Sequence, residues 1–307
     1  MDIEKDFAFA PHPEISTPRP LLTSINPTDP LGALKDLPGT WTGNGFNLIW
    51  LPHHPASGAF NDRLLKLSLF SETLEIESMP GSIPNRGYLQ GDITMHGVTY
   101  LQQAIDINTN EGLHVEPGIW ATAPMTSAPP EPSTIIRIAS IPHGTAVLAQ
   151  GFASQFSGPP RIPCIDTIPF IIGARKMKIP FPEANLSIPT ANRSPPGEMA
   201  GVTQAMVDDP NSVLISDLAE ITVAETIELH VSSDHAITGG GAVNSAFLDG
   251  TRAGGPNAQT ALVTARFWIE TRVGQTSPDY LQYSQTVLLN FRGLSWPHVT
   301  VATLQKA

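Results

Sequence analysis

Three histidines stand in surroundings that could support chemistry. His298 lies in the alternating stretch at the end of the chain, His114 stands two residues before Glu116, and His143 lies in a turn between a proline and a glycine. A neutral imidazole is a competent metal ligand, and it exchanges protons near neutral pH. On an inward-facing strand position His298 could therefore ligate a metal, while His143 at a cavity mouth could act as an acid–base group.

Each histidine also has a plainer interpretation. His298 could fill a solvent-facing strand position, His114 could face outward from its strand, and His143 could be an ordinary turn residue. Alternation places His298 on one face with Trp296, Thr300 and Ala302, and it places Val299 and Val301 on the other. Both faces are of mixed polarity, so the pattern by itself leaves open which face points inward.

The segments that must position these histidines have the character of β-strands. Apolar and polar residues alternate along 64–77, 221–231, 261–269 and 281–291, which is the period of a strand with one buried face. Shorter strands are expected at 46–51, 98–107, 113–122, 134–141 and 145–151. Few helical stretches separate them. The sequence therefore predicts an all-β fold, a closed antiparallel up-and-down barrel of about ten strands.

Other segments are expected to surround this barrel. Residues 1–29 form an extended N-terminal arm, and residues 30–307 form a single barrel domain. Residues 30–37 could make a short helix, with Asp29 as its N-cap. A proline-rich excursion, 152–219, interrupts the strand succession, and a connection of this length is uncommon unless it is functional. Its apolar content indicates packing outside the barrel or over its mouth, or alternatively a dimer interface.

Composition excludes several classes of partner. Lys and Arg number 17 against 28 Asp and Glu, so the net charge is −11. Nucleic-acid binding depends on clustered cations, so no nucleic-acid partner is expected, and no membrane-binding stretch is evident. Cys164 is the single cysteine, which rules out a disulfide within the chain. The acidic N-terminus lacks an apolar signal segment, and we expect a cytoplasmic protein.

Familiar catalytic motifs are absent. The chain has no GxSxG elbow, phosphate-binding GKS/T loop, HExxH pair or CxxC motif. Glu72, Glu75 and Glu77 share one predicted strand, but a pair of catalytic carboxylates needs a spatial separation that sequence does not supply. These carboxylates therefore receive no role from the sequence.

The order and spacing of three segments nevertheless resemble those of one known family. Gly39-Thr40-Trp41 follows the predicted short helix, a His–x–Glu–x–Gly–x–Trp stretch runs from His114 to Trp120, and His298 stands in the last strand. This order resembles the nitrobindin family, the haem-binding β-barrel domain also found at the C-terminus of some THAP-domain proteins. The succession TARFWIE, YLQYSQTVLLNF and HVTVATL agrees with it. The resemblance covers 31–151 and 220–305, and the excursion 152–219 has no counterpart in it.

The resemblance implies a function and a set of site residues. The protein would bind haem b, with His298 as the iron ligand and with Thr40, Trp41 and His114 also contacting the cofactor. His114 and His143 would line the distal side as candidate catalytic residues. The implied activity is binding or conversion of nitric oxide, peroxynitrite or peroxide, and an enzyme of this kind would be a peroxynitrite isomerase or act like a peroxidase.

A different class of function remains open. A barrel of this width can enclose one small ligand, so the alternative is a haem-free, lipocalin-like barrel that binds or transforms an apolar small molecule. In that case His114 and Glu116 could serve as acid–base groups without a cofactor. A homodimer is compatible with either interpretation.

Overall fold

The computed structural model describes residues 29–53, 63–141, 144–236, 238–245 and 258–307. Most of the predicted N-terminal arm (residues 1–28) and His143 lie outside the described residues. Among the helices that are described, none is long and apolar enough to cross a membrane.

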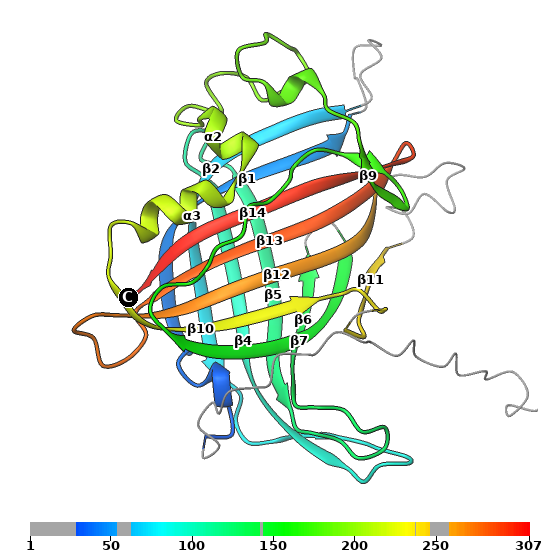
Figure 1. Ribbon diagram of the computed structural model, residues 1–307, viewed down its shortest axis with the longest axis vertical. Coiled ribbons are helices and arrows are strands. Elements are labelled where there is room, and N and C mark those ends of the chain that lie inside the picture. Colours follow the sequence, from blue (N-terminus) through cyan, green and yellow to red (C-terminus); the bar gives the residue numbers. More distant parts are fainter. Residues whose placement is uncertain (1–28, 54–62, 142–143, 237, 246–257) are drawn as a thin grey trace, which may run out of the picture.

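Ten antiparallel strands close into a barrel, which confirms the predicted fold class (Figure 1). Neighbouring strands follow one another around the barrel in the order β1-β2-β4-β5-β6-β7-β10-β12-β13-β14, and β14 pairs with β1 to complete the closure. Their bounds are β1 Gly39–Pro52, β2 Arg63–Ser78, β4 Ile93–Asp106, β5 Gly112–Ala123, β6 Thr134–Ile141, β7 Thr145–Ser157, β10 Val223–Ser232, β12 Gln259–Arg272, β13 Tyr280–Phe291 and β14 Leu294–Lys306.

Side chains alternate between two hydrophobic cores because successive strand residues point to opposite faces. One core fills the barrel and includes Trp41, Phe70, Phe267 and Leu304. The other lies on the outer surface, where Phe46, Trp50, Trp268 and Val301 are buried. Strands β1, β12 and β14 are therefore buried on both faces over part of their length.

The excursion covers the outer core. It begins later than predicted, because residues 152–157 still belong to β7. It carries β8 (Phe170–Ile171), β9 (Ala174–Lys178), η2 (Pro182–Ala184), α2 (Gln204–Asp208) and α3 (Asn211–Leu218) before β10. Figure 1 shows α2 and α3 outside the barrel, beside β1, β2 and β14. Val207 and Leu214 are buried there against the wall. The predicted packing outside the barrel is thus observed, and the helices within the excursion are short enough to have escaped the sequence pattern.

A 3₁₀ turn, η1 (Gly32–Leu34), closes one end of the barrel (Figure 1). The backbone N–H of Leu31 donates to Asp29 Oδ1 at 2.8 Å. Leu31 is the N-cap residue and no side chain caps the turn, so the prediction of Asp29 as the N-cap is wrong. Leu34 and Leu37 are buried in the interior core. We call this the η1 end. Because connections alternate between the two ends of an up-and-down barrel, the β4–β5, β6–β7 and β13–β14 turns all lie at the opposite end, which we call the far end.

Two smaller strands complete the sheet. β3 (Ile83–Asn85) pairs with β4, and β11 (Gly241–Asn244) pairs with β7. β8 pairs with β14 at Ser295, near the far end, and so ties the excursion to the barrel.

Candidate functional site

His298 lies on the lumen side of β14, toward the far end of the barrel. Ala302 and Leu304, which lie on the same face of β14 as His298, belong to the interior core. Val299 and Val301, on the other face, belong to the outer core. Its cross-strand neighbour on β13 is Val287, another interior residue. The structure thus assigns the face that sequence alternation left open.

The imidazole of His298 is held in place by a neighbouring strand. Its Nε2 lies 2.7 Å from Asn47 Oδ1 on β1, and the hydroxyl of Thr300 donates to the same oxygen at 2.9 Å. The His298 side chain remains half-buried. A hydrogen bond that fixes the ring orientation is a common feature of metal-ligating histidines.

Trp296 departs from the expected alternation. The sequence places it on the face of His298, yet its ring stacks on Phe181 of the excursion and on Phe291, at 5.2 and 4.6 Å between ring centroids. The indole N–H donates to the backbone carbonyl of Phe291 at 2.9 Å. Near the start of β14 these contacts draw the ring into the outer core, and Trp296 lines no part of the lumen core.

His114 and Glu116 meet in the lumen as the sequence suggested. His114 Nε2 lies 3.1 Å from Glu116 Oε2, and the His114 side chain is 22% exposed. Arg137 on β6 donates to Glu116 Oε1 at 2.6 Å, and the hydroxyl of Tyr100 on β4 donates to that oxygen at 2.5 Å. Burial by itself would raise the pKa of Glu116, but Arg137 and the hydrogen bonds from His114 and Tyr100 lower it to about 2. Glu116 is therefore an ionised carboxylate inside the barrel.

Arg137 links this group to β13. Its Nη1 donates to Gln285 Oε1 at 2.6 Å, and its Nε donates to the Tyr100 hydroxyl at 3.0 Å. Three strands, β4, β5 and β6, thus supply one hydrogen-bonded unit that β13 anchors from across the lumen. A buried arginine of this kind is strongly held because both its charge and its donors are matched.

A second carboxyl group lies nearby in a different state. The hydroxyl of Tyr283 donates to Glu72 Oε2 at 2.5 Å, and Gln102 Nε2 donates to Glu72 Oε1 at 3.1 Å. Burial raises the pKa of Glu72 to about 7, although these hydrogen bonds oppose the shift. Two lumen carboxyls whose environments separate their pKa values are suited to different acid–base roles.

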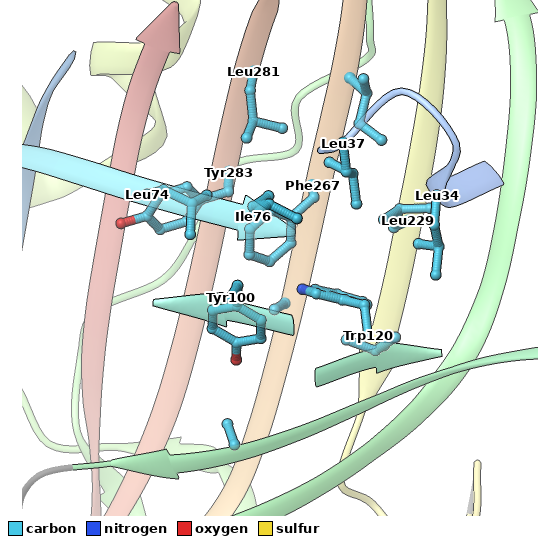
Figure 2. Close-up of a cluster of buried hydrophobic side chains, with 14 of the residues drawn as sticks. Leu34, Leu37, Leu74, Ile76, Tyr100, Trp120, Leu229, Phe267, Leu281 and Tyr283 are labelled. Atoms are coloured by element: carbon cyan, nitrogen blue, oxygen red, sulfur yellow. The ribbon is translucent and has the colours of Figure 1, made fainter. Parts of the chain in front are cut away.

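The space between these polar groups and η1 is small. A cavity of about 10 Å³ is lined there by Leu37, Tyr100, Gln102, Trp120 and Arg137, among others. Figure 2 shows the aliphatic and aromatic side chains of the interior core packed together, with the hydroxyl of Tyr100 directed away from Leu34 and Leu37. Such a volume holds about one water molecule. This cavity is therefore too small for a larger ligand.

Thr40 and Trp41 lie at the η1 end. Trp41 is fully buried in the interior core, and its indole N–H donates to the backbone carbonyl of Leu37 at 2.8 Å. Thr40 is exposed on the outer side. Trp41 pairs with Lys306, whereas His298 pairs with Ile49 at the other end of β1. The structure thus does not bring Thr40 or Trp41 near His298.

Of the predicted site residues, the structure places two at the far end. His298 and His114 both point into the lumen, and β6 ends at Ile141 at the same end of the barrel. His143 itself lies outside the described residues. Within the described part of the chain, no group of three or more His, Cys, Asp or Glu residues could hold a metal by protein ligands alone.

Gly118 has a specific place in the lumen network. A Cβ at this position would lie 2.3 Å from the ring of Tyr100, whose hydroxyl bonds Glu116 and Arg137. We therefore expect Gly118→Ala to displace Tyr100 and to lower the free energy of unfolding by about 1–3 kcal/mol. Urea unfolding measures this loss. Gly112→Ala, at an open position on the same strand, is the matched control, and equal effects of both variants would contradict the explanation.

Comparison with known proteins assigns this chain to no family. No protein family model and no curated protein sequence matches this chain. Among solved structures, the crystal structure of Rv2717c from M. tuberculosis matches 92% of this chain and 99% of its own, with 13% sequence identity and a TM-score of 0.42. Nothing about activity follows from so distant a likeness.

Proposed function

We propose that this protein binds a small molecule at the far end of the barrel lumen, and that this molecule is haem b, held through His298. The observation that carries the proposal is the inward imidazole of His298, half-buried and held by Asn47 at one end of a closed barrel. Small-molecule sites are typically concave and largely apolar with a few convergent polar groups. The lumen has this composition.

The residues present fit a haem in donor chemistry. An imidazole is a common axial ligand of haem iron, and Asn47 orients that of His298. The small cavity at the η1 end does not fit so large a group, so we place the haem at the far end. Bound haem would supply an iron centre for a diatomic ligand or a peroxide.

The surrounding residues of the chain would shape this chemistry. Glu116 is ionised and lies within hydrogen-bond distance of His114 Nε2, which favours an imidazole that can accept a proton on its other nitrogen. Arg137 and Tyr100 hold the carboxylate in position. His114 would therefore exchange protons with a ligand at the far end, and the apolar lumen residues would limit access of water.

The experiment is a visible spectrum of protein produced with haem supplied. We expect a Soret band that is lost in His298→Ala while far-UV circular dichroism stays unchanged. The matched control is His230→Ala, since His230 lies on the outer wall against Phe152 and should not affect the band. A colourless wild-type protein would overturn the haem proposal, and a band that survives His298→Ala would remove His298 as the ligand.

A haem-free barrel is the second candidate, favoured by the His114–Glu116–Arg137 unit and by Glu72. These groups supply an ionised carboxylate, an imidazole and a carboxyl that titrates near neutrality without any cofactor. The substrate would be an apolar small molecule that gains or loses a proton. Two results together would support this candidate. The wild-type protein would be colourless and bind an apolar fluorescent probe, and Val287→Trp, which fills the far end, would abolish binding of the probe.

A further inference from the structure

The excursion leaves one part of the outer wall uncovered. Helices α2 and α3 lie beside β1, β2 and β14, whereas β6 and β7 lie away from them (Figure 1). Among the described residues, none from β4, β5, β6 or β7 belongs to the outer core that the excursion covers. The inward positions of these four strands belong to the interior core and include Tyr100, Trp120, Ala139 and Val147. The positions that alternate with them therefore face outward, and we call this surface the β4–β7 face.

Aliphatic side chains lie in cross-strand register on the β4–β7 face. Ile119 on β5 pairs with Ile138 on β6, and Ile138 pairs with Leu148 on β7. Ile138 and Leu148 are 47% and 45% exposed. Neighbouring aliphatic side chains that are also exposed extend this strip toward the far end, at Ile105, Val115 and Val243. Side chains in register contact one another, so they form a continuous patch, and such a patch indicates an interaction site.

The β4–β7 face also carries no charge. Its outward positions within 99–105, 115–123, 134–140 and 146–154 hold no Asp, Glu, Lys, Arg or His. Outward positions elsewhere on the wall do carry charges, as at Glu75 on β2 and in the pair of Glu228 with Arg266. Depletion of charged residues is characteristic of the core of a protein–protein interface.

We propose that the β4–β7 face is the interface of a homodimer. A net charge of −11 opposes self-association, so a face without charge is where two copies can approach with the least repulsion. The strip is also complementary to itself. A two-fold axis beside Ile138 and along its strand would bring Ile138 against its own counterpart and Ile119 against Leu148 of the other copy, and all of these contacts are aliphatic.

The dimensions and composition of the face fit this partner. At a strand spacing of about 4.8 Å, β4, β5, β6, β7 and β11 make it about 20 Å wide. Exposed polar residues without charge, such as Gln103 and Ser140, border the aliphatic strip. An apolar core within a polar rim is the usual composition of an interface that buries about 800 Å² on each partner. No lumen residue takes part, so the dimer does not depend on a ligand in the lumen.

Sedimentation velocity of the full chain tests the proposal. At about 100 μM we expect twice the mass of one chain, with a dissociation constant of about 1 μM or lower. Ile138→Lys should raise that constant at least about a hundredfold, because two lysines would meet across the axis. Ile138→Glu should do the same. An equal mixture of these two variants should restore the dimer, because each side chain then faces an opposite charge.

Ile215→Lys is the matched control, since it makes the same change at an isoleucine that is 46% exposed and lies on α3, outside the β4–β7 face. This variant should remain a dimer. Leu148→Lys is a second change on the face and should also dissociate the dimer, and far-UV circular dichroism checks that each variant is folded. A monomeric wild-type protein, or a dimer that Ile138→Lys and Leu148→Lys leave intact, would overturn the proposal. Dissociation by Ile215→Lys to the same extent would place the interface elsewhere, and a mixture of the Lys and Glu variants that stays monomeric would contradict the two-fold packing at Ile138.

Discussion

Arg137→Met should be among the most destabilising single substitutions in this protein. The substitution leaves Glu116, which is 0% exposed and ionised, without the guanidinium that compensates its charge inside the barrel. Breaking a buried ion pair by removing one partner typically costs about 3–5 kcal/mol. We therefore expect a loss of this size in the free energy of unfolding, measured by urea denaturation at neutral pH.

Two comparisons isolate the cause. Arg266→Met removes a guanidinium from the outer wall, where the pair with Glu228 is partly exposed, and should cost about 1 kcal/mol or less. Combining Arg137→Met with Glu116→Gln removes the stranded charge and should recover part of the loss. If Arg137→Met costs no more than Arg266→Met, then the lumen network does not contribute the stability assigned to it.

Glu270→Gln should stabilise the protein at high pH and not at low pH. Burial raises the pKa of Glu270 from 4.5 to about 8. Between these values the folded chain holds a proton that the unfolded chain has released, so the wild-type protein loses stability as the pH rises through this range. A shift of this size corresponds to a few kcal/mol. The glutamine variant carries no such titration.

The measurement is the free energy of unfolding of both proteins at about pH 5 and about pH 9. Relative to wild type, the free energy of unfolding of the variant should be higher at about pH 9 than at about pH 5. Glu72 contributes a dependence of the same sign, but it is common to both proteins and cancels in the difference. Glu228→Gln serves as control, and a difference that does not vary with pH would show that Glu270 is solvated in the folded state.

Much of the fold was predictable because a half-buried strand has a period of two residues. The alternation along 64–77, 261–269 and 281–291 gave three barrel strands, and the small number of helical stretches between strands pointed to antiparallel closure. The helices of the excursion were not predicted. α3 has eight residues, too few for a clear helical period, and it is held by contacts such as that between Gln282 and Leu214 that lie far apart in sequence.

The candidate site was predictable only in part. His114 and Glu116 stand two residues apart, so their shared face followed from local geometry. The sequence analysis gave Arg137, Tyr100 and Glu72 no role in the site. An arginine within the apolar segment TIIRIASI was nevertheless a signal of a buried charge. Their role depends on which strands become neighbours and at what register, and the barrel closure decides both.

The sequence by itself determined that His298 lies in a strand and that Thr300 and Ala302 share its face, although it placed Trp296 there wrongly. Only the tertiary structure decided that this face is the lumen. Hydrophobic alternation normally marks the inward face of a barrel strand, yet Val299 and Val301 are 0% exposed on the outside of β14. The excursion buries that outer face, so apolar residues are favourable on both sides of the strand. Polarity therefore cannot distinguish inside from outside where a distant segment of the chain covers the wall.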